Sequence, residues 1–179
     1  MGAKHLLIYG PPAAGKLTVA QAIAERYDVR VLDNHVAVDA ALRLFTFGER
    51  GFFRLVHTIR VAMLESAALA GRDVVSTLAY AHPIDVPTVE RLLDASRAHG
   101  AEATVAQLLP SDDEVRRRVT SASRHATNKI SDLGLFDEVV TGHDLRTAYP
   151  GTDVTIDNTD LEPADVAEQL AARAGLRPR

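Results

Sequence analysis

The chain has 179 residues, of which 46% are hydrophobic, and this is enough for one well-buried core but short for two. The absence of Cys excludes a disulfide framework, a thiol nucleophile and a zinc site built on thiolates. The net charge of −4 gives no reason to expect nucleic acid or an anionic membrane as a partner. We therefore predict one domain over residues 1–179. Because the first apolar run is too short for a signal peptide or a membrane span, we also predict a cytoplasmic location.

Short apolar runs alternate with helical patterns along the chain. The apolar runs predict five strands, at 5–9, 29–32, 73–78, 103–109 and 153–156. Helical spacing predicts helices at 15–27, 36–71 with a break near 46–53, 85–99, from 110–111 onward, and 163–174. Ser111 and Glu114 have the spacing of a capping box at the start of the fourth of these regions.

This alternation predicts an α/β fold. Strands separated by helices imply right-handed crossovers and a parallel sheet that is covered on both faces. We expect a three-layer α/β/α domain with a five-stranded parallel sheet, in which the first two strands lie near each other. Ligand contacts should gather at the carboxyl ends of the strands.

The segment GPPAAGKLT, residues 10–18, fits the pattern GxxxxGK between a buried strand and an amphipathic helix. In such a loop, backbone N–H groups and the positive end of the following helix form a concave anion site, to which the lysine adds a charge. An ordinary turn before a helix is the alternative. We expect the whole loop to bind the phosphates of a nucleotide, through Gly10, Pro11, Pro12, Ala13, Ala14, Gly15, Lys16, Leu17 and Thr18.

Two features of the sequence favour a kinase over a hydrolytic ATPase. Leu17 stands where a magnesium-binding hydroxyl usually follows the lysine, and Thr18, the candidate metal ligand, comes one place later. This arrangement, GPPxxGKxT, resembles the loop of adenylate-kinase-type enzymes. In addition, the third strand carries Ser76 and Thr77 where a P-loop ATPase has a magnesium-binding acid.

The segment VLDNHVAVD, residues 31–39, follows the second strand and resembles the FLDxDxxIE-like segment of shikimate-kinase-type enzymes. The resemblance implies that Asp33 helps to hold magnesium. It places His35 at the family's second acidic position, which orients or deprotonates the acceptor hydroxyl. A histidine can accept a proton near neutral pH, so the chemistry survives this exchange, although the acceptor should differ from shikimate. The alternative role for Asp33 is a helix N-cap.

The next insertion contains Phe53-Arg54, which resembles the FRxxE-like segment of the same kinases. The resemblance implies that Arg54 binds an acidic group on the acceptor, and His57 replaces the glutamate of that pattern. A surface arginine is the alternative for Arg54. We expect Phe52 and Phe53 to belong to the core.

Three polar residues follow the third strand. Tyr80, His82 and Asp85 are placed to line an acceptor pocket, because they lie at the carboxyl end of that strand. Tyr80 is our candidate for acceptor binding. For Asp85 we favour the N-cap of the next helix.

Residues 116–129 hold five Arg or Lys and no acid in a chain of negative net charge. Arginines that close over transferring phosphates stabilise the charge of the transition state. The segment resembles the lid of short P-loop kinases, over about 116–131. The resemblance makes Arg118 and Arg124 catalytic residues, with Arg118 also binding the nucleotide. A solvated helix face is the alternative for Arg116 and Arg117, and the missing aromatic residues count against a nucleic-acid patch.

Together, these resemblances imply an ATP-dependent phosphotransferase that moves the γ-phosphoryl group of ATP-Mg to a hydroxyl of a small molecule. The cofactors would be ATP and Mg²⁺, and the acceptor a polyol, a nucleoside or an antibiotic. Two alternatives stay open. One is a nucleotide-binding regulatory protein with little catalysis, and the other is a kinase acting on a nucleotide-sugar or on nucleic-acid ends.

Overall fold

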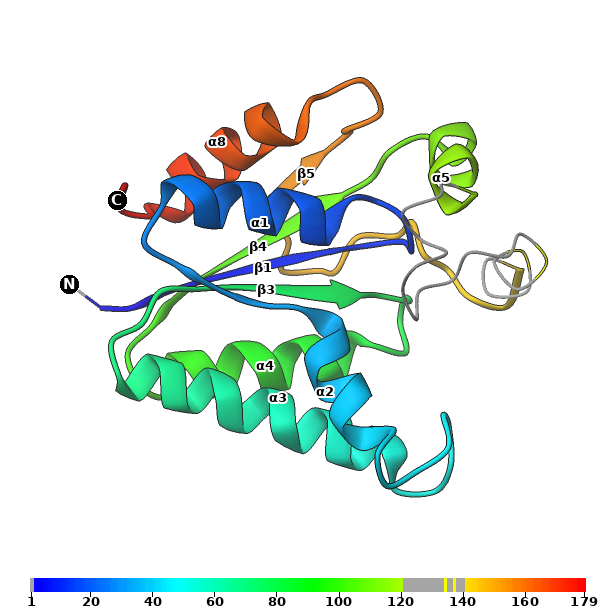
Figure 1. The fold of residues 1–179 in the computed structure, drawn as a ribbon, viewed down its shortest axis with the longest axis horizontal. Helices are drawn as coiled ribbons and strands as arrows, with labels where there is room; N and C mark the ends of the chain where they lie inside the picture. Colours follow the sequence, from blue (N-terminus) through cyan, green and yellow to red (C-terminus); the bar gives the residue numbers. More distant parts are fainter. Residues whose placement is uncertain (1, 121–133, 135–136, 138–140) are drawn as a thin grey trace.

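The computed structural model describes residues 2–120, 134, 137 and 141–179, and its centre is a parallel sheet (Figure 1). The five strands are ordered β2-β3-β1-β4-β5. Each neighbouring pair runs in parallel. The strands are β1 (Lys4–Gly10), β2 (Arg30–Leu32), β3 (Val74–Ala79), β4 (Glu102–Leu108) and β5 (Val154–Ile156).

The middle strand, β1, is buried on both faces. Leu6, Leu7, Ile8 and Tyr9 are each 0% exposed, as a continuous apolar run in a central parallel strand requires. Ile8 is paired with a residue of β3 on one side and of β4 on the other. The carboxyl end of β1 therefore lies in the middle of the row of strand ends where ligands bind in open α/β folds.

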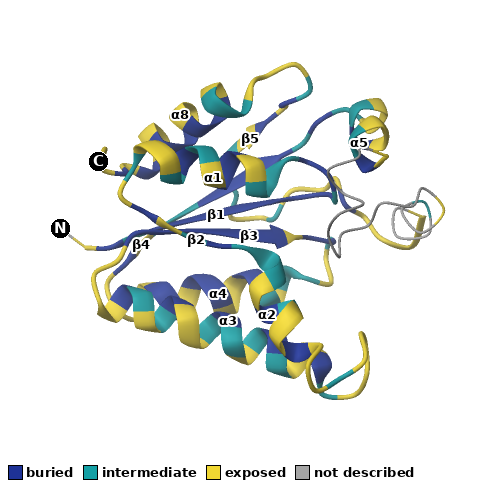
Figure 2. Cartoon of the chain, viewed as in Figure 1, coloured by how far each residue is buried: buried dark blue, intermediate teal, exposed yellow. Residues whose placement is uncertain are grey.

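Helices cover both faces of the sheet (Figure 2). On one face α1 and α8 pack over Leu6 and Ile8, and on the other α3 and α4 pack over Leu7 and Tyr9. The predicted three-layer arrangement is confirmed. The helices are α1 (Lys16–Arg26), α2 (Asn34–Ala41), α3 (Phe52–Leu69), α4 (Val86–Arg97), α5 (Asp112–Val119) and α8 (Pro163–Ala174).

The structure refines several expectations. All five strands are found within a residue or so of their predicted bounds, and the break in the long helical region separates α2 from α3. However, β3 lies between β1 and β2, so the first two strands are not neighbours. Most of the predicted lid, including Arg124, falls outside the described residues. No helix in the described part of the chain is long and apolar enough to cross a membrane.

The buried stripe of α3 contains an arginine. Phe52, Val56, Arg60 and Leu64 recur every four residues and all face the interior. Phe52 is a core residue, as predicted. The same prediction is wrong for Phe53, which is 50% exposed because it stands one position off this stripe. Arg60 is thus the one charged residue among the buried residues of α3.

Candidate active site

The segment that joins β1 to α1, counted from Gly10, contains three residues with positive φ. Gly10 has a φ of 149°, and a Cβ there would lie 2.2 Å from the carbonyl oxygen of Leu108, so only glycine fits. Ala13 adopts a φ of 65°, which is uncommon for a residue with a side chain, and Gly15 a φ of 92°. Alternation of left- and right-handed residues turns successive N–H groups toward one concavity. These φ values are compatible with the anion-binding loop predicted for residues 10–18, and nucleotide binding by the loop stays a prediction.

Lys16 begins α1, and its side chain lies back across the loop. Its Nζ donates hydrogen bonds to the carbonyl oxygens of Gly10 at 2.9 Å and Pro11 at 2.6 Å. The ammonium group and the amino-terminal end of α1 therefore bring positive charge to the same concavity. Thr18 is exposed in the first turn of the same helix.

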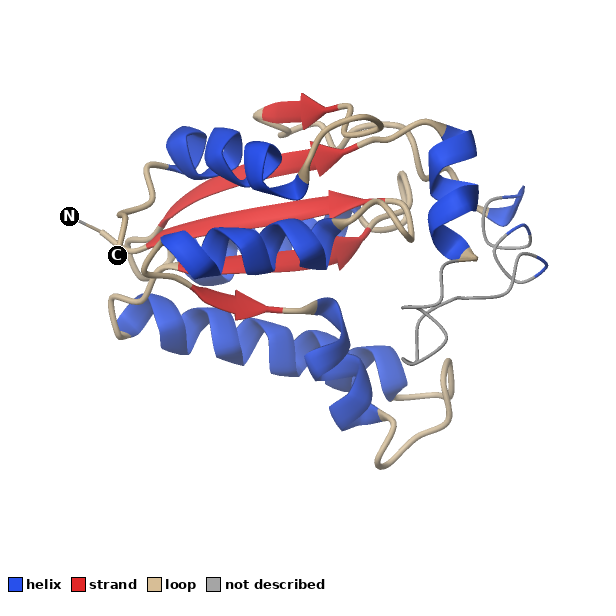
Figure 3. Cartoon of the chain, turned by 45° about the horizontal axis from the view of Figure 1, so that its top comes forward, coloured by secondary structure: helices blue, strands red, loops and turns tan. Residues whose placement is uncertain are grey.

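Helix α5 lies beyond the carboxyl ends of the strands (Figure 3), and Arg118 ties this helix to the loop. Its Nη1 donates to the carbonyl oxygen of Ala14 at 3.2 Å, and its Nη2 to that of Asn158 at 2.9 Å. The amide of Asn158 also donates to the Ala14 oxygen, at 2.9 Å. Arg118 and Asn158 thus lie next to Gly15, which belongs to residues 10–18, the segment named here the phosphate loop after its predicted ligand. The sequence pointed to Arg118 but not to Asn158.

The start of α5 departs from the predicted capping box. The Ser111 hydroxyl accepts from the Glu114 amide, which is one half of that motif. The other half is absent, because the Ser111 amide donates to Thr159 and the Glu114 carboxylate binds Arg117 and Arg118 instead. The hydrogen bonds from Arg117 and Arg118 lower the pKa of Glu114 to about 2, so the carboxylate stays charged and holds Arg118 in place.

Asp33 lies at the N-cap position of α2, but its side chain does not cap the helix. Instead its Oδ1 accepts a hydrogen bond from the Thr77 hydroxyl at 3.1 Å, and the same hydroxyl accepts from the Asn34 amide at 3.0 Å. Thr77 therefore fixes the carboxylate at the edge of the sheet. In the sequence, Thr77 is notable only as a position without an acid, and its positioning role follows from a contact with a residue 44 positions away.

The carboxylate of Asp33 fits a magnesium ion that is carried by a nucleotide. Mg²⁺ prefers oxygen ligands and is usually held by one or two carboxylates together with substrate phosphates. Asp33 offers a carboxylate whose second oxygen, Oδ2, has no hydrogen-bond partner among the described residues. No cluster of three or more metal-binding side chains occurs in the described ranges, so the protein there offers too few ligands to form an ion cage.

The residues expected to meet the acceptor lie in different settings. His35 is half-buried in the first turn of α2, next to Asn34. Arg54 is exposed near the start of α3. Tyr80 is only 1% exposed, and its hydroxyl lies 3.0 Å from Nδ1 of His82. Burial is the main cause that raises the pKa of Tyr80 to about 12. Acceptor binding by these three residues stays a prediction.

Asp85 occupies the predicted N-cap position of α4, yet it too binds elsewhere. Its Oδ2 accepts from the amide of Ala81 at 2.9 Å, within the loop that precedes the helix. The neighbouring His82 amide donates to the carbonyl of Asp144 at 2.7 Å. That contact fastens the segment following the predicted lid to the carboxyl end of β3.

Arg60 also lies near this site, although the sequence motifs do not point to it. Its Nη2 donates to Oδ1 of Asn34 at 2.6 Å, so the guanidinium lies beside the turn that carries Asp33 and His35. The signal that could have revealed it is a cation within the four-residue apolar spacing of α3.

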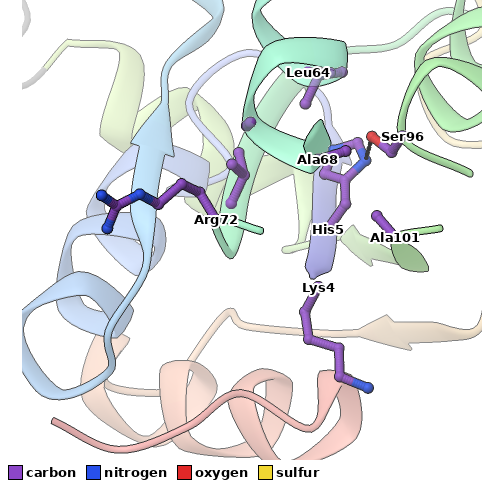
Figure 4. A pocket seen from close by; sticks show the side chains of 9 residues that line it. Lys4, His5, Leu64, Ala68, Arg72, Ser96 and Ala101 are labelled. Atoms are coloured by element: carbon purple, nitrogen blue, oxygen red, sulfur yellow. Dashed lines mark hydrogen bonds between the residues drawn. The ribbon is translucent and has the colours of Figure 1, made fainter. Parts of the chain in front are cut away.

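A narrow gap lined by His5, Lys4 and Ala68 lies at the opposite, amino-terminal end of β1 (Figure 4). There His5 is 2% exposed, its Nε2 lies 2.7 Å from the Ser76 hydroxyl, and its Nδ1 lies 2.8 Å from that of Ser96. Both ring nitrogens are thus occupied by neutral partners. This is a satisfied core histidine, and it lies at the other end of β1 from the phosphate loop.

Together, the order of the strands, the loop after β1 and the helix that follows it define the fold of the P-loop kinases. No protein-family model matches the chain, and neither does any curated protein. Solved structures do match along nearly its whole length. A tunicamycin resistance protein from Deinococcus radiodurans has a TM-score of 0.68 at 19% identity, covering 99% of this chain and 100% of its own.

Two further structures have the same fold. A sugar kinase from Janibacter sp. HTCC2649 has a TM-score of 0.68 at 13% identity, with 95% of this chain and 93% of the other covered. A shikimate kinase from Acinetobacter baumannii, solved with shikimate, has a TM-score of 0.57 at 18% identity, covering 96% and 92%. At these identities the likeness establishes the fold.

Proposed function

We propose that this protein is an ATP-dependent phosphotransferase that moves the γ-phosphoryl group of ATP to a hydroxyl of a small molecule. The observation that carries the proposal is the phosphate loop, where Ala13 has the backbone of an anion cradle and Lys16 lies across it. Kinases of small molecules among the structures of like fold support it further.

Nucleotide binding is assigned to the loop, to Lys16 and to Arg118. The loop N–H groups and the Lys16 ammonium would surround the β- and γ-phosphates, where they stabilise the charge that spreads over the transferred oxygens. Arg118 would hold the loop in shape through Ala14 and contact the nucleotide beside it. Arg124, in the predicted lid, is assigned to the same transition state.

Acceptor activation is assigned to the turn after β2. The acceptor oxygen attacks the γ-phosphorus in line, the bond from that phosphorus to the β–γ bridging oxygen breaks, and ADP leaves. His35 takes the proton of the hydroxyl as the new bond forms. Asp33, fixed by Thr77, would hold magnesium together with Thr18, and the ion supplies charge neutralisation between the phosphates.

A mass-spectrometric screen for phosphorylated products tests the proposal. ATP and Mg²⁺ are offered with a panel of polyols, sugars, nucleosides and antibiotics, and Lys16→Ala is the control. We expect one class of acceptor to gain a phosphoryl group with wild type and to lose at least a hundredfold in rate with the variant. Product that survives Lys16→Ala would disprove the role of Lys16.

The same screen separates the alternatives. Tight ATP binding without any product from the panel would support a nucleotide-binding regulator and reject the kinase. Phosphorylation of an oligonucleotide end, with binding that falls steeply as salt rises, would instead identify a nucleic-acid kinase.

A further inference from the structure

Arg60 places a positive charge inside the apolar stripe of α3. The residue is only 9% exposed, and Val56 and Leu64, one turn away on either side, are core residues. Removing a charged group from water is costly unless it gains a partner of opposite charge and hydrogen bonds. A cation in this position therefore calls for a counter-charge.

The protein supplies only part of what Arg60 needs. Nη2 donates to the side-chain oxygen of Asn34 at 2.6 Å and more weakly to its carbonyl oxygen at 3.4 Å. Among the described residues, Nε and Nη1 have no hydrogen-bond partner, and no carboxylate is within ion-pair distance of the guanidinium. The neutral amide of Asn34 orients the guanidinium without neutralising it.

Asp85 is the nearby acid, and it acts only through space. Burial lowers the pKa of Arg60 to about 10, against the opposing effect of the Asp85 charge. The Asp85 carboxylate itself is bound to the amide of Ala81 at 2.9 Å. Within the described residues, the positive charge of Arg60 thus has no directly bonded counter-charge.

A second arginine reinforces this positive region. The pKa of His57, on the same helix, is lowered first by burial and then by the charges of Arg60 and Arg91, while Asp85 opposes them. The fields of two guanidinium groups therefore overlap at this imidazole, where α3 packs against α4. A positive and partly desolvated wall attracts anions.

The unbonded donors of Arg60 are reachable. In the described part of the chain, no atom of Arg60 is among the side-chain polar atoms that lack both a hydrogen-bond partner and contact with solvent. Because Asn34 lies between Asp33 and His35, the guanidinium adjoins the turn that would receive the acceptor.

We propose that Arg60 binds an oxyanion, a carboxylate or a phosphate group, carried by the acceptor. The acceptor would then be an anionic hydroxy compound, and Arg60 would select it over neutral polyols. Charge-assisted hydrogen bonds from Nη1 and Nε to the oxyanion supply the missing counter-charge. The identification of the ligand as the acceptor rests on the proposed phosphotransfer, but the oxyanion site itself does not.

Anion binding tests the site directly. Malonate and inorganic phosphate are titrated by calorimetry into protein saturated with Mg²⁺ and a non-hydrolysable ATP analogue, so that the phosphate loop is filled. We expect Arg60→Gln to weaken binding at least tenfold and Arg43→Gln, which removes an exposed arginine, to leave it within twofold. The anion that binds with the higher affinity shows whether the site prefers a carboxylate or a phosphate group. Equal binding by wild type and Arg60→Gln, or no binding by wild type, would overturn the proposal.

Affinity for the ATP analogue reports whether each variant is folded. Should Arg60→Gln fail this check, Arg60→Lys takes its place. It keeps the charge but lacks the planar donors that reach Asn34 and the anion together, so a loss of about threefold or more is expected. An Arg60→Lys protein that binds the anion like wild type would then refute the site.

Acceptor pairs test the link to catalysis. Hydroxy acids are compared with their amides, for example glycerate with glyceramide. Arg60→Gln should raise the KM of the acid at least tenfold and leave that of the amide unchanged. If a neutral acceptor is turned over fastest and Arg60→Gln does not change its turnover, the oxyanion site is rejected and the proposed kinase activity stands. If anion binding depends on Arg60 but no acceptor is phosphorylated, the proposed kinase activity is rejected and the oxyanion site stands.

Discussion

The guanidinium of Arg118 and the carbonyl oxygen of Ala14 are joined by a hydrogen bond of 3.2 Å, which ties α5 to the phosphate loop. The two residues are 104 positions apart in the chain. Glu114, one helical turn before Arg118, binds the same guanidinium, with its Oε1 at 2.6 Å from Nε. A carbonyl that accepts from both Arg118 and Asn158 cannot turn toward the phosphates of a nucleotide bound as proposed, and so would not repel them. The contact therefore keeps the loop in its anion-binding shape.

Arg118→Gln should consequently weaken nucleotide binding. We expect the Kd for ATP to rise about tenfold, which corresponds to about 1.4 kcal/mol, because the loop loses a charged donor at Ala14. Arg117→Gln is the matched control, since among the described residues the Arg117 side chain bonds to Glu114 and does not reach the loop. Calorimetric titration of both variants measures the difference. Equal affinities would show that Arg118 does not support the loop.

Thr77→Val keeps the shape of the side chain and removes its hydroxyl. Asp33 loses its hydrogen bond, and the Asn34 amide loses its acceptor, so the free energy of unfolding should fall by about 1–3 kcal/mol. In the kinase reaction we expect kcat to fall and the magnesium concentration at half-maximal rate to rise severalfold. Thr77→Ser should restore both values. If the magnesium dependence of Thr77→Val were the same as that of wild type, Asp33 as positioned by Thr77 would not be a magnesium ligand.

These contacts explain which parts of the site the sequence could predict. The strand, the phosphate loop and α1 follow one another within a short segment, so the local pattern is sufficient. Arg60 and Asn34 are 26 residues apart, Thr77 and Asp33 are 44 apart, and Arg118 and Ala14 are 104 apart. No local spacing encodes such pairs, because the order of the strands and the packing of α3 bring them together.

The correction at Phe53 has the same origin. Both Phe52 and Phe53 are apolar enough for a core, and only the rotation of α3 against the sheet decides which one is buried. That rotation also directs Arg60 toward Asn34 and leaves Arg54 exposed. The resemblance to kinase segments identified an arginine on this helix, whereas the structure shows which arginine touches the turn after β2.

Gly10→Ala tests the close approach of the loop to β4. The added methyl group would meet the Leu108 carbonyl oxygen at 2.2 Å and would also strain a φ of 149°, so we expect a loss of more than about 2 kcal/mol in stability. Nucleotide binding should be lost with it. Gly48→Ala is the control, because its φ of 76° carries the strain without any atom within 4 Å, at a cost of about 1 kcal/mol. Urea denaturation compares the two, and similar losses would show that the contact with Leu108 does not matter.

The buried His5 makes stability depend on pH. Burial, with a smaller effect of Arg97, lowers its pKa from 6.5 to about 4. Between these two values the unfolded chain binds a proton that the folded protein does not, so stability is complete above pH 6.5 and falls as the pH drops toward 4. The loss should reach about 3 kcal/mol at pH 4.

His5→Gln removes this titration while keeping an amide that can bond to Ser76 or Ser96. Urea unfolding between pH 4.5 and 7.5 should show a flatter profile for the variant than for wild type, whatever its stability at pH 7.5. A smaller slope should remain in the variant, because the pKa of His57 is also lowered. Glu114, whose pKa is lowered from 4.5 to about 2, adds to the slope near pH 4.5, where the unfolded chain begins to bind its proton, but this contribution is the same in both proteins. Identical slopes in both proteins would mean that His5 is protonated in the folded core without cost.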